Sequence, residues 1–337
     1  MIITKQWLNE FIDITDISTE TICKGLNAIG LEVDSVSKIE IPQGIQIGYV
    51  EECVKHPDAD KLSICQVDLG YEKVQIVCGA KNVAAGQYVP VATIGTKLGE
   101  DFIIKPSVLR GTASNGMICS STEIGLPKMN DGILPLDGSI GELILGRELG
   151  AYPLINDDII EIELTPNRGD CLNILGVVKE LSAYFSLPQK EIEYHNNEHS
   201  GAIGRILEVE YLTKTPTSLV YKVADIEEFS LPVLYKIRIS LIDETKNTDI
   251  ETALAYINHT TGIALNIYTK SIAVNGDDMI HLKVNDNENG FAQVIGNIPL
   301  SIVGIEAGYI EKIDNIVVLE ASYIEPSYLA QKVFLTK

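Results

Sequence analysis

The sequence predicts a multi-domain α+β protein, with a small β-barrel inserted in a discontinuous small α+β domain and a further α+β domain after it. Its 337 residues exceed the length of a usual single domain. Short alternating apolar runs fill residues 41–150, whereas residues 1–40 and 151–190 carry helical spacing. Helix and strand patterns mix again in residues 200–337. These three observations predict the fold class.

The first domain is expected to combine residues 1–40 with residues 151–190, because the second segment alone is too short to enclose a core. In the first segment, Ser18 is suited to cap a helix and Gly30 to end it in a left-handed conformation. In the second segment, Asp170 is expected to cap another helix.

Residues 41–150 predict a barrel of short strands. Gly and Asn-Gly pairs interrupt the apolar runs at short intervals, which is typical of small all-β units. The strand candidates are residues 45–49, 74–78, 89–94 and 102–104.

The third domain is expected to begin at residue 200, after a polar linker at residues 191–200. Its order of strands and helices predicts an α+β unit. The strand candidates are residues 207–211, 219–224, 281–284, 291–295, 300–305 and 316–319, and the helix candidates are residues 231–242 and 250–259.

The formal net charge of −21 argues against a general nucleic-acid binder, because phosphate attraction requires clustered Lys and Arg. Residues 41–150 are the least acidic stretch, with 9 Lys and Arg against 13 Asp and Glu. If any part of the chain touches RNA, this stretch is the best placed.

The cysteine pattern predicts reduced, mostly buried thiols in a cytoplasmic protein, since no two cysteines form a CxxC pair. No apolar run is long enough for a membrane span, and no signal peptide is expected. His195 and His199 have the spacing of metal ligands on a helix but lie in the polar linker, so no metal site is predicted. The six cysteines are Cys23, Cys53, Cys65, Cys78, Cys119 and Cys171.

Three runs in the barrel region each place a polar turn after a strand end: residues 56–62, 77–83 and 109–120. Such turns can present cations and amides to a phosphate or a base edge, as in barrels that bind single strands. The alternative is that these residues merely close turns. The candidate RNA-binding residues are Lys61, Lys81, Asn82, Arg110, Ser114 and Asn115.

Together the three runs resemble the OB-fold tRNA-binding module that several tRNA-associated proteins share. The resemblance spans roughly 100 residues and three ordered motifs. It implies a five-stranded OB barrel with a tRNA-associated role, and no DNA-binding role.

A fourth run, from Leu164 to Leu172, combines a proline turn with a capped helix start and leaves Arg168 free to pair with a carboxylate. This is a structural device, and no catalysis is assigned to it. The run resembles the hallmark of the beta subunit of bacterial phenylalanine–tRNA ligase. The runs Thr4–Leu8 and Gly30–Asp34 are similar to the same family.

The resemblance implies a scaffold and tRNA-facing region of a cytoplasmic heterotetramer, without a catalytic residue of its own. The family's holoenzyme joins phenylalanine to tRNA(Phe), and its ATP and phenylalanine sites lie on the alpha subunit. ATP and Mg²⁺ are therefore expected as cofactors of the holoenzyme and not of this chain. The implied partners are the alpha subunit and tRNA(Phe), and the third domain is expected to be truncated at Lys337.

Residues 200–337 resemble the family's module that hydrolyses tyrosine wrongly attached to tRNA, with two departures. Asn266 stands where the family has His, and Tyr309 stands where it has Glu. Asn cannot exchange a proton as His does, and Tyr carries no charge at neutral pH. A degenerate editing pocket is therefore predicted, with hydrolysis lost or weakened. Its residues are Gly262, Asn266, Gly304, Tyr309 and Ala321.

Two alternatives remain open from the residues alone. A free-standing tRNA-binding OB protein would have no need of the run from Leu164 to Leu172. A free aminoacyl-tRNA deacylase would require the proton-transfer group that Asn266 lacks.

Overall fold

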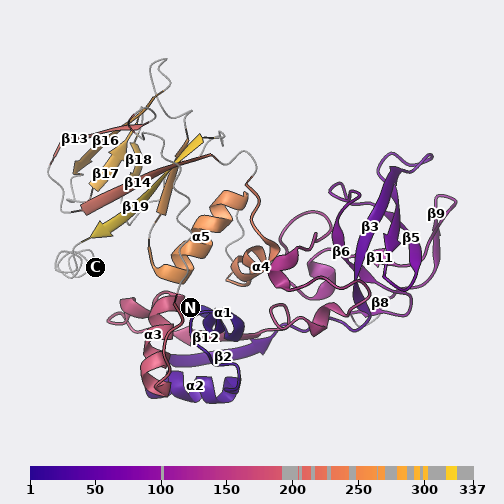
Figure 1. The fold of residues 1–337 in the computed structure, drawn as a ribbon, viewed down its shortest axis with the longest axis horizontal. Coiled ribbons are helices and arrows are strands. Elements are labelled where there is room, and N and C mark those ends of the chain that lie inside the picture. Colours follow the sequence, from indigo (N-terminus) through magenta and orange to yellow (C-terminus); the bar gives the residue numbers. More distant parts are fainter. Residues whose placement is uncertain are drawn as a thin grey trace. The chain divides into compact units, whose positions relative to one another are not determined.

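The chain divides into two compact units, which Figure 1 shows as a ribbon. The first unit comprises Met1–Glu191 with Leu231–Tyr256, and the second comprises Ile192–Ser230 with Ile257–Lys337. The computed structural model describes residues 1–99, 102–191, 204, 207–213, 217–225, 229–242, 248–263, 265–269, 279–286, 292–296, 299–302 and 316–324.

The N-terminal lobe of the first unit contains a three-stranded antiparallel sheet, ordered β1 (Ile2–Thr4), β12 (Asp158–Glu163) and β2 (Glu32–Lys38). The strand β12 lies between the other two, so the segments on both sides of the barrel share one sheet (Figure 1). This strand falls in a segment whose spacing predicts only helix, and its place in the middle of the sheet explains the isoleucines Ile160 and Ile162 at the core.

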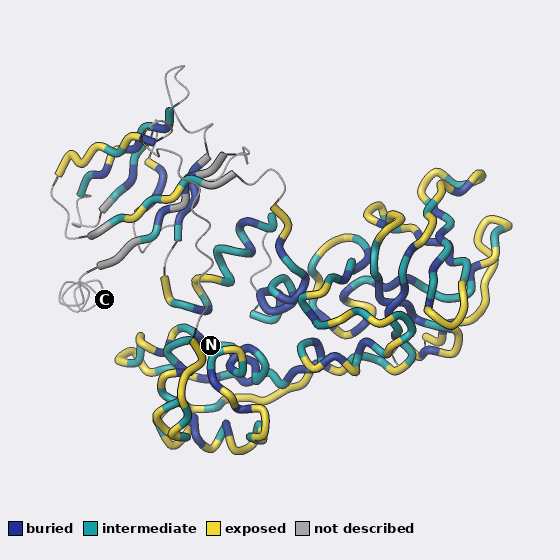
Figure 2. The backbone as a smooth tube through the Cα atoms, in the orientation of Figure 1, coloured by how far each residue is buried: buried dark blue, intermediate teal, exposed yellow. Residues whose placement is uncertain are grey.

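Three helices cover the lobe: α1 (Lys5–Asn9), α2 (Thr19–Ala28) and α3 (Ile174–Phe185). As predicted, the Ser18 hydroxyl caps α2 by accepting from the Thr21 N–H. Gly30 follows α2 with a positive φ of 83°. Residues of the three helices and of the sheet form one apolar core, and Figure 2 colours such buried residues dark blue.

The prediction that Asp170 caps the third helix is wrong. Residues Gly169–Cys171 form a short 3₁₀ turn, η4, and Asn173 caps α3, accepting from the Gly176 N–H at 2.8 Å. The Asp170 carboxylate is held by the Arg168 guanidinium instead, whereas Asn173 has the extended backbone that an N-cap requires.

The barrel is a five-stranded sheet that nearly closes on itself. The two edge strands of the sheet are not paired with each other. A backbone hydrogen bond links them, from the Asn115 N–H, just before one edge strand, to the Gln75 carbonyl of the other at 2.8 Å. In sheet order, the strands are β11 (Met117–Ile118), β6 (Tyr88–Ala92), β3 (Ile45–Lys55), β4 (Ser63–Asp68) and β5 (Lys73–Cys78).

Two short hairpins extend from the barrel. The first pairs β7 (Lys97–Leu98) with β8 (Phe102–Ile103), and the second pairs β9 (Ser107–Leu109) with β10 (Thr112–Ser114). Short 3₁₀ turns lie after the barrel strands, at Thr122–Ile124, Gly138–Ile140 and Leu149–Ala151.

A segment distant in the sequence also belongs to the first unit: the helix α4 (Val233–Leu241) and the part of α5 (Asp249–Thr261) up to Tyr256. The Asp137 carboxylate accepts from the Val233 N–H at 2.7 Å, at the start of α4. The buried Arg238 of α4 forms an ion pair with Glu10 at 2.8 Å. Sequence order alone assigned this segment to the domain of residues 200–337, whereas residues 231–256 cluster with the first unit.

The second unit contains two sheets with a shared apolar core. One is ordered β13 (Leu207–Tyr211), β16 (Ile280–Asp286), β17 (Ala292–Ile295) and β18 (Pro299–Ile302). The other is ordered β14 (Thr217–Asp225), β19 (Ile316–Ile324) and β15 (Leu265–Thr269). The prediction of a mixed α and β chain with a small barrel is confirmed.

Candidate nucleic-acid interface

A groove of about 700 Å³ opens beside the barrel, between the end of β5 and the short hairpins. Its lining combines apolar side chains such as Phe102, Ile103 and Leu109 with charged ones of both signs. The charged residues are Lys105, Lys128, Glu123 and Asp131. Phe102 is 55% exposed, whereas phenylalanine is usually buried. A half-exposed ring beside cations is the arrangement on which bases stack in single-strand binders.

Buried His56 ties the first predicted motif to the third. Its Nδ1 accepts from the Asp58 N–H at 3.1 Å, and its Nε2 lies 2.9 Å from the Thr112 hydroxyl. Because Nδ1 is an acceptor, the neutral ring carries its proton on Nε2 and donates to Thr112. The residue therefore fixes the turn at residues 56–62 against β10 and does not present its ring to solvent.

The three predicted cations Lys61, Lys81 and Arg110 are exposed. None of them forms an ion pair with another residue that the structure describes. Arg110 sits at the tip of the β9–β10 hairpin with a φ of 52°, and Gly111 follows at 85°. Two consecutive positive φ values are those of the tight hairpin turn that presents its first central side chain to solvent.

The three predicted polar residues lie in structural positions. The Asn82 side chain forms two hydrogen bonds with the backbone of Ile133. Its amide donates to the carbonyl at 2.9 Å, and its oxygen accepts from the N–H at 3.0 Å. The Ser114 hydroxyl is buried and accepts from the Val77 N–H at 3.0 Å. Asn115 uses its backbone N–H to close the barrel edge. Of the six candidates, only Ser114 lines the groove, so the groove and the exposed cations are neighbouring but different features.

The groove residues that sequence patterns missed are Phe102, Ile103 and Lys105. Their signal was an apolar pair followed by a cation in a segment expected to be a strand. Such a pair reads as core unless the surrounding hairpin is known to project from the barrel.

In the N-terminal lobe, Arg168 pairs with carboxylates, as the sequence predicts. Its guanidinium lies 3.1 Å from Asp170 and 3.0 Å from Glu180, and it also donates to the Ile29 carbonyl at 3.3 Å. Arg168 thus joins the end of α2 to α3, which is a structural role.

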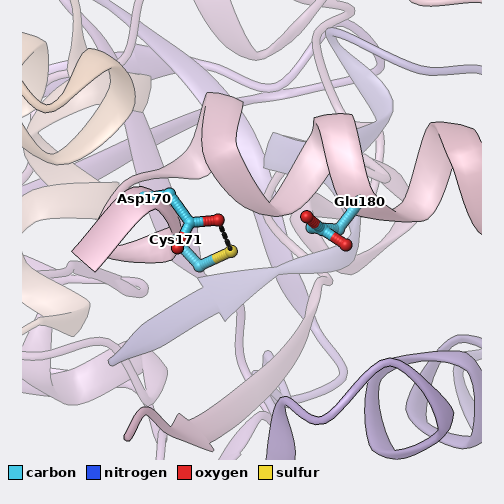
Figure 3. A group of neighbouring side chains, drawn as sticks. All are labelled: Asp170, Cys171 and Glu180. Carbon is cyan, nitrogen blue, oxygen red and sulfur yellow. Dashed lines mark hydrogen bonds between the residues drawn. The ribbon is translucent and has the colours of Figure 1, made fainter. Parts of the chain in front are cut away.

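Asp170, Cys171 and Glu180 have their possible ligand atoms within 4.8 Å of one another, which is the spacing of a small metal site (Figure 3). Burial and the neighbouring Asp170 raise the pKa of Cys171 to about 11, which keeps the thiol protonated at neutral pH. Arg168 already neutralises both carboxylates and lies 2.9 Å from the Cys171 sulfur. A cation with thiolate ligands does not fit this set.

Of the predicted editing pocket, Asn266, Gly262 and Ala321 are described, whereas Gly304 and Tyr309 lie outside the described residues. Gly262 follows α5 with a φ of 74°. Asn266 pairs with Glu320 across β15 and β19, while Leu265 pairs with Ala321. Because side chains alternate along a strand, Asn266 and Ala321 lie on opposite faces of this sheet.

Asn266 joins a buried polar cluster around Glu320, whose side chain is 0% exposed. Glu320 Oε1 accepts from Asn266 Nδ2 at 3.0 Å and from the Tyr268 hydroxyl at 3.1 Å. The Tyr268 hydroxyl also lies 2.8 Å from the Ser301 hydroxyl. Burial and the adjacent carboxylate raise the pKa of Tyr268, so the phenol remains a donor.

Within the described part of the chain, no helix combines the length and the apolar composition that crossing a membrane requires.

Comparison with known proteins agrees with the barrel and extends beyond it. Residues 45–142 match a family model described as "Putative tRNA binding domain". The phenylalanine–tRNA ligase beta subunit of Sulfurimonas denitrificans is 45% identical, over 98% of this chain and 43% of its own length. That of Wolinella succinogenes is 42% identical, over 100% of this chain and 44% of its own length.

A solved structure, a MetRS-related protein from Pyrococcus horikoshii, is 23% identical, covering 30% of this chain and 84% of its own, with a TM-score of 0.23. The beta-subunit matches, in contrast, run from the N-terminal lobe through the second unit. The chain is therefore related over nearly its whole length to a part of the phenylalanine–tRNA ligase beta subunits, and it spans a little under half the length of the curated relatives that it matches.

Proposed function

We propose that this chain acts as part of the beta subunit of a cytoplasmic phenylalanine–tRNA ligase, together with an alpha subunit. The holoenzyme would convert ATP, L-phenylalanine and tRNA(Phe) into Phe-tRNA(Phe), AMP and pyrophosphate. The observation that carries this proposal is the 45% identity to a beta subunit over 98% of the chain. ATP and Mg²⁺ would bind elsewhere in the holoenzyme, and this chain would serve as scaffold and tRNA-facing surface.

The barrel is the part that we place against tRNA. Its support is the family match to residues 45–142 and the exposed cations Lys61, Lys81 and Arg110, none of which forms an ion pair with a described residue. The barrel acts as a weak, positioning surface, because its overall charge is acidic and phosphate contacts are few.

The test uses the full-length beta subunit assembled with its alpha subunit. Replacing Lys61, Lys81 and Arg110 by Ala should raise the KM for tRNA several-fold and leave phenylalanine-dependent ATP–pyrophosphate exchange unchanged. The matched control replaces Lys24 and Lys73, which pair with Glu20 and Glu51 and do not line the groove. If the control raises the KM equally, or if neither variant does, the barrel does not contact tRNA.

The proposal for the second unit is an editing-like module whose hydrolysis is lost or weakened. It is supported by Asn266, whose amide donates to buried Glu320 and offers no group that exchanges a proton at neutral pH. Tyr309 at the position of the family's Glu is the second support. Supplying Tyr-tRNA(Phe) to the holoenzyme and following deacylation decides the matter. Fast release of tyrosine that disappears on Asn266→Ala would overturn the proposal.

A further inference from the structure

Two free cysteines face each other inside the barrel. Cys53 on β3 and Cys65 on β4 are register partners in the antiparallel ladder, and their sulfur atoms lie 3.7 Å apart. Cys65 is fully buried, whereas Cys53 is partly exposed. Cys53 is thus the less buried of the two, and its thiol donates to the Val83 carbonyl at 3.7 Å.

The ladder places these cysteines where side chains approach most closely. The His56 N–H donates to the Leu62 carbonyl at 3.0 Å, three positions further along the same pair of strands. Hydrogen-bonded and non-hydrogen-bonded pairs alternate in an antiparallel ladder, so Cys53 and Cys65 form a non-hydrogen-bonded pair. In such pairs the Cα atoms are about 4.5 Å apart, which lies inside the span that a disulfide bridges.

A third thiol, Cys78 on β5, provides an internal comparison. Cys78 pairs with Ser63, and Cys65 pairs with Ile76, so Cys78 is only a diagonal neighbour of Cys65. Diagonal neighbours on one face are roughly 7 to 8 Å apart, beyond the reach of a disulfide without backbone movement. The ladder thus favours Cys65 bonding to Cys53 over Cys78.

We propose that Cys53 and Cys65 are a site of reversible oxidation, which a hydroperoxide converts into a cross-strand disulfide. The Cys53 thiol loses its proton and its sulfur attacks one peroxide oxygen. The O–O bond breaks, Cys53 becomes a sulfenic acid, and the leaving hydroxide takes up the released proton as water. The Cys65 sulfur then attacks the Cys53 sulfur, the S–O bond breaks, and the departing hydroxide takes the Cys65 proton. With hydrogen peroxide, the two thiols give up two electrons and the products are the disulfide and two waters.

The order of these steps follows from the surroundings of the two sulfur atoms. Burial, reinforced by the proximity of Cys53, raises the pKa of Cys65 well above its ordinary value. Cys65 therefore stays protonated and does not attack the peroxide, and the less buried Cys53 meets the peroxide first. Cys65 attacks only afterwards, because its sulfur lies next to Cys53 and the departing hydroxide takes its proton. The new bond would link β3 to β4 covalently, two residue pairs away from the end of the strands at the turn that carries Lys61.

The experiment treats the assembled holoenzyme with hydrogen peroxide, alkylates the remaining thiols in denaturant and maps a non-reducing digest by mass spectrometry. The expected product is one peptide pair joined through Cys53 and Cys65 that dithiothreitol separates, with Cys78 and Cys119 recovered as alkylated thiols. Recovery of Cys53 and Cys65 both alkylated, or a link from Cys65 to Cys78, would overturn the proposal.

Two variants test the order of attack. Cys65→Ser should leave Cys53 as a sulfenic acid that dimedone labels, whereas Cys53→Ser should abolish both the label and the cross-link. Cys78→Ser is the matched control and should form the cross-link at the wild-type rate. Labelling of Cys65 in the Cys53→Ser variant would contradict the assigned order. The wild-type digest decides the main question even if a variant fails to fold.

Discussion

Two arginines in the first unit show how differently one residue type is used in its two parts. Arg168 in the N-terminal lobe is held by Asp170, Glu180 and a backbone carbonyl. Arg110 in the barrel stands at a hairpin tip, with no ion pair to any described residue. Arg168 thus stabilises the lobe, whereas Arg110 is exposed and is not used in an ion pair with any residue that the structure describes. A distinctive motif is therefore not by itself a functional site.

The largest effect is expected at Gly176 of α3, which packs against the backbone of Asp170. A Cβ added at Gly176 would overlap the Asp170 carbonyl oxygen, which belongs to the backbone and cannot rotate away. Gly176→Ala should destabilise the lobe by about 3 kcal/mol or more. Gly169→Ala is the control, because a Cβ there meets no atom within 4 Å. Fluorescence of Trp7, the single tryptophan, measured against urea reports the lobe's unfolding.

The next effect concerns Asp157, which accepts from the Thr4 hydroxyl at 2.5 Å and from the Gln6 N–H at 3.0 Å. Burial raises its pKa from 3.8 to about 6, because desolvation outweighs the donated hydrogen bonds. The folded protein thus binds this proton more tightly than the unfolded chain does. The stability that this proton supplies is complete below pH 4 and is lost as the pH rises to about 6.

The measurement compares wild type with Asp157→Asn by urea unfolding at pH 4.5 and pH 7, with Trp7 fluorescence as the probe. The difference in unfolding free energy between the two proteins should change by roughly 1 to 3 kcal/mol, with wild type gaining at the lower pH. A difference that is constant with pH, or larger at pH 7, would contradict the role assigned to burial.

The smallest effects sharpen the comparison of the two arginines directly. Arg168→Ala should cost about 1 kcal/mol of lobe stability, because it removes one charge-assisted cluster that is partly exposed to solvent. Arg110→Ala should change stability by less than about 0.5 kcal/mol and should lower the slope of tRNA affinity against salt by about one. If Arg110→Ala destabilises the protein and Arg168→Ala changes the salt dependence of tRNA affinity, the roles assigned to the two arginines are wrong.

Local patterns predicted the parts of the fold that local physics determines. Alternation located most strands of the barrel, and Ser18 and Gly30 marked the ends of α2. The missed cap at Asn173 shows the limit. Asp170 and Asn173 are equally suited to cap a helix by residue type, but the Arg168 guanidinium holds the Asp170 carboxylate. A competition between two partners is not visible in residue preferences.

For the candidate site residues, exposure could be predicted from the sequence, but hydrogen bonds to distant residues could not. Lys61, Lys81 and Arg110 are exposed, as turn chemistry suggests. Asn82 and Ser114 instead satisfy backbone groups that the sequence does not place near them, such as Ile133 and Val77. The grouping of residues 231–256 with the first unit was equally hidden, because it rests on contacts such as Val233 with Asp137, far apart in the chain.

The middle strand of the lobe sheet sets an order for biosynthesis. Met1 donates to the carbonyl of Ile162, a contact across 161 positions of the chain. A ribosome makes β1 and β2 well before it makes β12, so the lobe cannot be completed until the entire barrel has emerged. Nascent chains of this kind should form the barrel first and carry an unfinished, chaperone-accessible N-terminus until the last central strand arrives.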